Sequence, residues 1–317
     1  MLSITVILCT YNRHESLATA LESVAASQLA DSTEWEVLVV DNNSKDQTRA
    51  VIEKFCEKFP RRFRYLFEPK PGKSHALSTG IREARGSVLA FVDDDVVVDR
   101  TWLQNLTAPF QSPTWVGVGG RILPERNFTP PAWLNVDAPY ALAPLAVFDL
   151  GTKSRPLDEP PFGTNMAFRK EVFAKYGGFR TDLGPRPGNE IRNEDTEFGR
   201  RLLAAGEHLF YEPSAIVYHS VPQNRVRKEY FLDWWFDKAR ADIREFGIPP
   251  ATRWSVKGIP LYVFRRLAVW TVRWMIALNS GTRFGRKLKV YGLLGLASEC
   301  YRQSATIRVN RKDNAKA

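Results

Sequence analysis

The chain has 317 residues, of which 44% are hydrophobic and 25% are charged, and this composition is that of an ordinary globular protein without low-complexity segments. Its length allows one large domain, or a domain with an appendage, and either can bury a substantial core. The net charge is +10, from 45 Lys and Arg against 35 Asp and Glu, so nucleic acid, anionic lipid and phosphorylated small molecules are all acceptable partners.

The three cysteines carry a prediction about location. Cys9, Cys56 and Cys300 are far apart, odd in number and without metal-ligand spacing. We therefore expect no disulfide framework and a reducing, cytoplasmic compartment. Residues 1–9 are apolar but lack a basic leader and a cleavage pattern, which favours a strand over a signal peptide.

The first third of the chain alternates short apolar runs with amphipathic segments. We expect strands at 4–9, 35–40, 63–67 and 87–92, and helices at 15–26, around 51–55 and at 74–84. Strands that alternate with helices imply βαβ crossovers, so the predicted fold class is α/β with a mostly parallel sheet. Ligands of such sheets bind at the carboxyl ends of the strands.

Polar residues follow three of these strands directly, at 10–13, 41–43 and 93–95. The fold should bring these segments to one edge of the sheet. Asp93, Asp94 and Asp95 stand out, because three adjacent carboxylates at a buried strand end need compensation. A divalent cation that bridges nucleotide phosphates would supply it, and the alternative is a solvated acidic turn.

The middle of the chain is less regular. We expect a strand at 115–120 and an irregular loop at 124–157. A strand at 163–169 should lead into a short helix that ends at Gly177 and Gly178, followed by a Gly- and Pro-rich loop at 181–192. A helix at 193–205 and strand material at 209–219, broken at Pro213, complete this part.

Helices dominate beyond residue 228, and we expect them at 230–246, 261–279 and 284–302, with a frayed end. We therefore divide the chain into a catalytic domain, 1–228, and a helical region, 229–317. No apolar stretch is long enough to span a membrane. One stripe of the second helix carries Phe264, Leu267, Ala268, Thr271, Trp274, Met275 and Leu278, with Arg266 and Arg273 opposite. That stripe predicts either packing on the catalytic domain or peripheral contact with an anionic membrane at its inner face.

Six segments together resemble glycosyltransferase family 2, the inverting nucleotide-sugar transferases of the GT-A fold. They are residues 6–13, 39–46, 71–80, 93–95, 163–168 and 194–198, in family order and at family-like distances. The resemblance covers roughly residues 3–220 and implies a GT-A fold with a C-terminal helical extension. Processive synthases of the family carry a Gln-x-x-Arg-Trp motif, whereas residues 223–227 lack the terminal Trp, so transfer of a single sugar is expected.

The resemblance implies a nucleotide site and a metal site. The nucleotide-binding positions would be Thr10, Tyr11, Asn12, Arg13, Asp41, Lys73, Asp93 and Asp94. Asp41 can accept the ring N–H of uracil and Tyr11 can stack on its face. Asp95, Asp93 and His219 would bind Mn²⁺ or Mg²⁺, with Asp94 mainly a spacer. Turn formation at Thr10 and Asn12, helix capping by Asp41, a helix-flanking charge at Lys73 and a structural His219 are the alternatives.

The resemblance also implies a catalytic pair. Asp195 matches the general base, which takes the proton of the acceptor hydroxyl, and Glu194 is its acceptor-side neighbour. The alternative is a pair of acids that the dipole favours in a first helical turn. The expected partners are a nucleotide sugar, with UDP as the nucleotide, and the hydroxyl of a glycan or lipid-linked saccharide. The competing functions are a nucleotidyltransferase of related fold and a basic nucleic-acid-binding protein.

Overall fold

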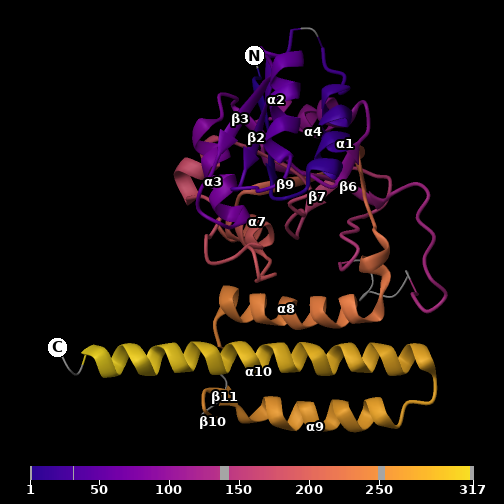
Figure 1. Cartoon of the computed structure of the whole chain (residues 1–317), viewed down its shortest axis with the longest axis vertical. Coiled ribbons are helices and arrows are strands. Elements are labelled where there is room, and N and C mark those ends of the chain that lie inside the picture. The colour runs from indigo at the N-terminus through magenta and orange to yellow at the C-terminus, as the bar shows by residue number, and fades with distance from the viewer. Residues whose placement is uncertain (1, 31, 136–142, 249–253, 315–317) are drawn as a thin grey trace. The chain divides into compact units, whose positions relative to one another are not determined.

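The computed structural model describes residues 2–30, 32–135, 143–248 and 254–314 and divides the chain into two compact units (Figure 1). Unit 1 comprises Met1–Phe128, Leu145–Asn189 and Glu194–Val221. Unit 2 comprises Thr129–Pro144, Glu190–Asn193 and Pro222–Ala317. The predicted end of the catalytic domain at residue 228 remains a proposal.

Unit 1 is built on a mixed sheet. Its described part orders the strands β3-β2-β1-β4-β8-β6-β9-β5, with β7 paired to β9. The strands are β1 Ile4–Thr10, β2 Trp35–Asp41, β3 Phe63–Phe67, β4 Val88–Asp93, β5 Val96–Val98, β6 Trp115–Pro124, β7 Arg155–Leu157, β8 Asn165–Arg169 and β9 His208–His219. The run β3-β2-β1-β4 is parallel, as predicted. The rest is not mostly parallel, because β8 is antiparallel to both β4 and β6, and β9 is antiparallel to β5 and β7.

The parallel register aligns the polar segments that follow the strands. Thr10, the last residue of β1, pairs with Asp41 of β2, and Cys9 pairs with Asp93 of β4. The carboxyl ends of β1, β2 and β4 therefore lie at one edge of the sheet. This confirms the predicted grouping of the three polar segments.

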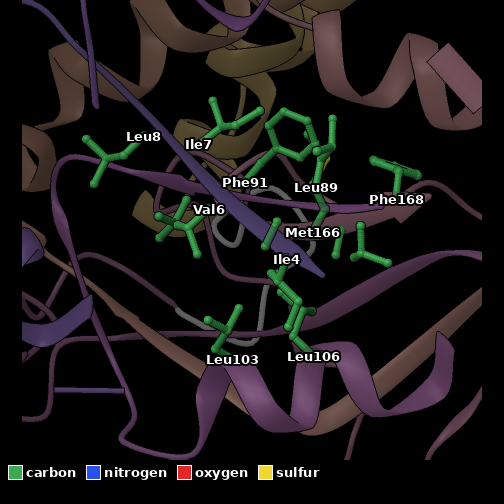
Figure 2. Packing of buried hydrophobic residues seen from close by; sticks show 14 of the residues in the cluster. Ile4, Val6, Ile7, Leu8, Leu89, Phe91, Leu103, Leu106, Met166 and Phe168 are labelled. Atoms are coloured by element: carbon green, nitrogen blue, oxygen red, sulfur yellow. The ribbon is translucent and has the colours of Figure 1, made fainter. Parts of the chain in front are cut away.

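Helices cover the sheet of unit 1 (Figure 1). They are α1 His14–Ala25, α2 Thr48–Lys58, α3 Lys73–Glu83, α4 Trp102–Thr107, α6 Glu171–Tyr176 and α7 Glu194–Ala204. The strand residues Ile4, Val6 and Leu8 are buried at 1% exposure or less and pack with the side chains in Figure 2. Burial on both faces explains why these strands show apolar runs rather than alternation.

Strand β9 differs from its prediction. The sequence predicted a break at Pro213, yet β9 continues through it. The register with β6 shifts between Gly120 and Arg121, whose partners are Glu212 and Ile216. Pro213 lies in this irregularity, where its missing N–H costs no ladder hydrogen bond.

Unit 2 contains α8 Lys228–Phe246, α9 Leu261–Met275 and α10 Ser280–Asn314, with a small hairpin of β10 Ser255–Val256 and β11 Ile259–Pro260 before α9. Helix α10 packs against both α8 and α9 (Figure 1). It extends to Asn314, so the predicted end at residue 302 is wrong. The last residues were expected to be frayed, but 303–314 are helical, and 315–317 lie outside the described residues. No helix in the described part of the chain is long and apolar enough to cross a membrane.

A buried carboxylate joins α10 to α8. Glu299 is 1% exposed, and its Oε1 atom lies 2.8 Å from Nε of Arg244. Arg240 lies 3.5 Å from the other oxygen of the same carboxylate. A buried charge without such partners would be costly, so these arginines hold the two helices in one register.

Candidate active site

Asp94 and Asp95 lie in the tight turn between β4 and β5 and share one cation. Nη1 of Arg13 lies 2.9 Å from Oδ1 of Asp94 and 3.0 Å from Oδ2 of Asp95. Burial raises the pKa of Asp94 to about 6, and the charge of Asp95 adds to this, while Arg13 opposes it. Burial alone would lower the pKa of Arg13, yet the two carboxylates raise it above its ordinary value. Asp94 is therefore more than a spacer, because it helps to hold a guanidinium at this turn.

Asp93 ends β4 and faces a different cation. Nζ of Lys73, in the first residue of α3, lies 2.6 Å from Oδ1 of Asp93. The hydroxyl of Thr164 donates to Oδ2 over 2.7 Å. Burial would raise the pKa of Asp93, but Lys73 and Thr164 outweigh it and lower the pKa to about 2. Both oxygens of Asp93 are thus engaged within the protein.

Glu194 and Asp195 open α7. The backbone N–H of Gly163 donates to Oδ2 of Asp195, and the N–H of Thr196 donates to Oδ1 over 2.7 Å. These bonds fix the carboxylate, and each oxygen keeps a lone pair for another proton. A Cβ atom on residue 163 would lie 2.9 Å from Oδ2 of Asp195, so the close approach requires glycine there.

Glu194 is buried beside Asp195. Oε1 of Glu194 lies 3.7 Å from Nζ of Lys73. Burial raises the pKa of Glu194 to about 7, and the negative charge of Asp195 adds to the shift, while Lys73 opposes it. A small cavity is lined by Cys9, Lys73, Asp93, Gly163, Glu194 and Asp195, among others. The predicted phosphate-side and acceptor-side residues therefore face one cavity.

Asp41 ends β2 and forms a separate part of the site. Its Oδ1 accepts from the backbone N–H of Ser44 over 2.8 Å, and its Oδ2 accepts from the Tyr65 hydroxyl over 3.2 Å. Burial raises the pKa of Tyr65 to about 12, helped by the charge of Asp41. Asp41 does not cap the following helix, because Asp46 accepts from the N–H of Thr48 at the start of α2.

Thr10, Asn12 and Tyr11, at and just after the end of β1, have different surroundings. Asn12 has a φ of +51° and its Oδ1 accepts from the N–H of Lys45 over 2.7 Å, so it joins two loops, as the turn interpretation predicted. Thr10 is buried at the strand end. Tyr11 follows Thr10 in the chain and is 38% exposed, so its ring is accessible to a ligand.

His219 lies at the end of β9, opposite Val96 in the register with β5. It is buried, and its Nε2 lies 3.4 Å from Oδ1 of Asp95. An imidazole nitrogen and a carboxylate oxygen are ligands that Mn²⁺ accepts, whereas Arg13 on the other oxygen of Asp95 competes with a metal ion for this carboxylate. The described residues contain no group of three His, Cys, Asp or Glu side chains arranged to hold a metal. A divalent ion here would need further oxygen ligands from phosphate or water.

Comparison with known proteins identifies the family. The model of glycosyl transferase family 2 matches residues 5–177, which is more than half of the chain. This chain belongs to glycosyltransferase family 2. It is therefore an enzyme of the glycosyltransferase class, as the sequence predicted, and this decides against the nucleotidyltransferase and nucleic-acid-binding alternatives.

Individual relatives agree with this family. The succinoglycan biosynthesis protein ExoM of Rhizobium meliloti is 28% identical over 227 residues, 71% of this chain and 69% of that protein. The glucosyl-dolichyl phosphate glucuronosyltransferase of Haloferax volcanii is 25% identical over 240 residues, 74% of this chain and 75% of that one. A solved mannosyltransferase, PcManGT from Pyrobaculum calidifontis in complex with GDP-Man and Mn²⁺, superposes with a TM-score of 0.62 at 20% identity, covering 93% of this chain and 86% of that one. This likeness confirms the GT-A fold.

Some residues of the site were missed by sequence reasoning. Thr164 and Gly163 belong to a segment that the resemblance includes, but neither was given a role. Ser44, which donates to Asp41, lies in the matched segment 39–46 but was given no role, and Tyr65 was not singled out at all. A tyrosine in a strand next to Asp41 gives no local signal, because the contact depends on the pairing of β2 with β3.

Proposed function

We propose that this glycosyltransferase moves one sugar from a UDP-sugar to a hydroxyl of a glycan or lipid-linked saccharide, with inversion at the anomeric carbon. The observation that carries the proposal is the placement of Asp195 on the same cavity as Lys73 and Asp93. Inverting transfer requires a base on the acceptor side and cationic or hydrogen-bonding groups on the leaving-group side. Both kinds of group border this cavity.

Asp195 would take the proton of the acceptor hydroxyl. The acceptor oxygen then forms a bond to the anomeric carbon while the bond from that carbon to the phosphate oxygen breaks on the opposite face. The proton ends on Asp195, and the electron pair of the broken bond leaves with the nucleoside diphosphate. The bonds from Gly163 and Thr196 hold the carboxylate so that its orientation is set before the substrate arrives.

Asp95 and His219 would hold Mn²⁺ or Mg²⁺, with Asp93 as a further candidate ligand. When bound, such an ion would neutralise charge on the diphosphate leaving group. Asp93 already binds Lys73 and Thr164, so we assign it first to positioning the lysine. Lys73 and Arg13 supply the positive charges of this chain near the phosphates.

Asp41 and Tyr11 would bind the nucleobase. The bonds from Ser44 and Tyr65 leave lone pairs on the carboxylate of Asp41, which can accept a ring N–H. The solved neighbour binds GDP-Man, so guanine is the base to test against uracil. Uracil and guanine both carry a ring N–H, and the choice between them is part of the proposal.

The test is a donor screen that follows release of the nucleotide, combined with calorimetric titration of UDP and GDP with and without Mn²⁺. We expect UDP to bind at least about tenfold more tightly with the metal than without it. Equal affinity in the presence and absence of Mn²⁺ would refute the metal site. Tighter binding of GDP than UDP would refute uracil as the base.

We further propose that the enzyme works in the cytoplasm, at the inner face of the membrane when its acceptor is lipid-linked.

The sequence motif of processive synthases is absent, and this favours transfer of one sugar per acceptor. Product analysis by mass spectrometry tests it, because a ladder of additions to one acceptor would contradict single-sugar transfer.

A further inference from the structure

Helix α9 is apolar on two sides. One side carries Val263, Leu267, Trp270 and Trp274, which are buried or half-buried at intervals of three and four residues. This side faces α10, because Lys287 of α10 lies over the ring of Trp274 at 5.6 Å. Packing on α10 therefore covers one of the two apolar sides of α9.

The other side of α9 is mostly apolar and exposed, and the exposed Arg265 lies on it between Leu261 and Val269. This side carries Leu261, Phe264, Val269, Val272, Met275 and Ile276. Val272, Met275 and Ile276 are 51%, 59% and 66% exposed, and Leu278, just past the helix, is fully exposed. We call these seven residues the α9 outer face. Trp254, in the segment that leads into α9, is 71% exposed. Exposed apolar residues that gather on one side of a helix are typical of a binding site.

The charge around this face has a single sign. Residues 246–298 contain no Asp or Glu, although the chain has 35 of them. The same stretch contains nine basic residues, Arg253, Lys257, Arg265, Arg266, Arg273, Arg283, Arg286, Lys287 and Lys289. The occupant of the α9 outer face must therefore tolerate, or be attracted by, a concentration of positive charge.

This charge decides between two occupants. A second copy of the chain would bring Arg265, Arg266 and Arg273 of both copies together, with no acid in this stretch to compensate them. A bilayer with anionic lipids offers apolar acyl chains for the outer face and negative headgroups for the arginines. Tryptophan at position 254 suits the same boundary, where aromatic rings bind between headgroups and chains.

We propose that the α9 outer face is a membrane-docking surface, on which α9 lies in the interfacial plane of a bilayer that contains anionic lipid. The apolar side chains enter the boundary between headgroups and acyl chains, and the arginines contact the headgroups. Over its 15 residues, α9 extends about 22 Å along the surface. Binding to lipid needs neither donor nor acceptor, so it can hold or fail independently of the proposed transfer reaction.

The experiment is flotation of the full-length protein with vesicles of phosphatidylcholine, with and without phosphatidylglycerol, at low and high salt. We expect the protein to float with the anionic vesicles at low salt and to be released in part by high salt. Protein that stays at the bottom with anionic vesicles at low salt overturns the proposal. Equal flotation with both kinds of vesicle overturns the proposed contact between the arginines and anionic headgroups.

Two variants separate the apolar and the basic contributions. Val272→Ser with Met275→Ser should lower the partition coefficient at least about tenfold, because two large apolar side chains are removed. Arg265→Gln with Arg266→Gln should lower it about tenfold on anionic vesicles only. The matched controls are Leu294→Ser with Tyr301→Ser, exposed on α10, and Lys54→Gln with Arg61→Gln, exposed in unit 1. Partition that falls as much in the controls as in the α9 variants overturns the assignment to α9.

A second readout excludes misfolding and a protein partner. Vesicles with brominated acyl chains should quench tryptophan fluorescence of the wild type, and Trp254→Phe should reduce the quenched fraction while thermal unfolding is unchanged. A dimer in solution that Val272→Ser with Met275→Ser converts to monomer would assign the face to a second copy and overturn the proposal. Absence of quenching in a protein that floats would place its lipid contact away from Trp254 and overturn the proposed depth.

Discussion

The candidate active site of unit 1 and the α9 region of unit 2 differ in how their charges are arranged. In the candidate site, buried or half-buried carboxylates pair with nearby cations: Asp93 pairs with Lys73, and Asp94 and Asp95 share Arg13. Around α9 in unit 2, basic residues stand without any acid in the stretch 246–298, beside an exposed apolar face. Buried charge must be matched inside the protein, whereas exposed charge of one sign is available for an external partner.

This difference suits the candidate active site of unit 1 to catalysis and the proposed α9 outer face to the binding of a membrane. The unit 1 groups are fixed by hydrogen bonds before any substrate arrives, which is what a reacting centre requires. The exposed basic groups of unit 2 cost little in solution and can turn to suit a partner. Substitutions should therefore have large and specific effects in unit 1 and small effects on stability around α9.

Asp195→Asn should have the largest effect. The amide cannot take the acceptor proton, so we expect kcat for sugar transfer to fall by at least about a thousandfold while nucleotide affinity stays near normal. Rates of nucleotide release and calorimetric titration measure the two quantities. Glu197→Gln on the same helix is the control, because Glu197 pairs with Arg201 outside the cavity. Turnover that survives in Asp195→Asn would remove Asp195 as the base.

Lys73→Met tests whether matched charge holds the site together. Removing the lysine leaves the half-buried Asp93 without its cation, so we expect the free energy of unfolding at pH 7 to fall by about 2 kcal/mol. Arg266→Met on α9, where the side chain is exposed, should change it by less than about 0.5 kcal/mol. Chemical denaturation of both variants measures the contrast. Equal losses of unfolding free energy in both variants would contradict the contrast between paired charge in the candidate site and exposed charge on α9.

The effect of Lys73→Met on stability should depend on pH. The pKa of Asp93 is lowered to about 2 in the folded protein from an ordinary value of 3.8, so the ion pair stabilises the fold fully above pH 3.8. That contribution is lost as the pH falls through 2. The stability difference between wild type and Lys73→Met should therefore shrink between these two pH values, and a constant difference would contradict the pairing.

Glu194→Gln should stabilise the protein at high pH. Glu194 has a pKa of about 7 in the folded state against an ordinary 4.5, so ionisation costs the folded state stability as the pH rises between these values. The glutamine variant avoids that cost, and above pH 7 its free energy of unfolding should exceed that of the wild type by on the order of 2 kcal/mol. Denaturation at pH 4.5 and pH 8 compares them, with Glu197→Gln as control. A gap that does not widen with pH would show that Glu194 is not destabilised by burial.

Asp95→Ala should have the smallest of these effects. We expect the Mn²⁺-dependent gain in nucleotide affinity to fall about tenfold, because one oxygen ligand is lost while the phosphates remain as ligands. Titrations with and without Mn²⁺ measure the gain. The exposed Glu53→Ala, on α2, is the control. An unchanged gain would move the metal site away from Asp95.

Many strands and helices of the fold could be predicted from local sequence patterns. The strands at Ile4–Thr10 and Phe63–Phe67 and the helix at His14–Ala25 follow from apolar runs and from spacing of Leu17, Leu21 and Val24. Prediction weakened where long-range pairing decides. The antiparallel placement of β8 between β4 and β6 and the continuation of β9 through Pro213 depend on partners distant in the sequence.

The family and the α/β class could be predicted from the sequence alone, because motifs and periodicity are local properties of the chain. The roles of the candidate site residues stay predictions. The pairing of each carboxylate with a cation became known from the three-dimensional structure: Lys73 pairs with Asp93, and Arg13 with Asp94 and Asp95. The structure also showed which side of α9 packs on α10 and which is exposed. Such pairings depend on distance through space, and that distance is set by strand register and helix packing rather than by spacing along the chain.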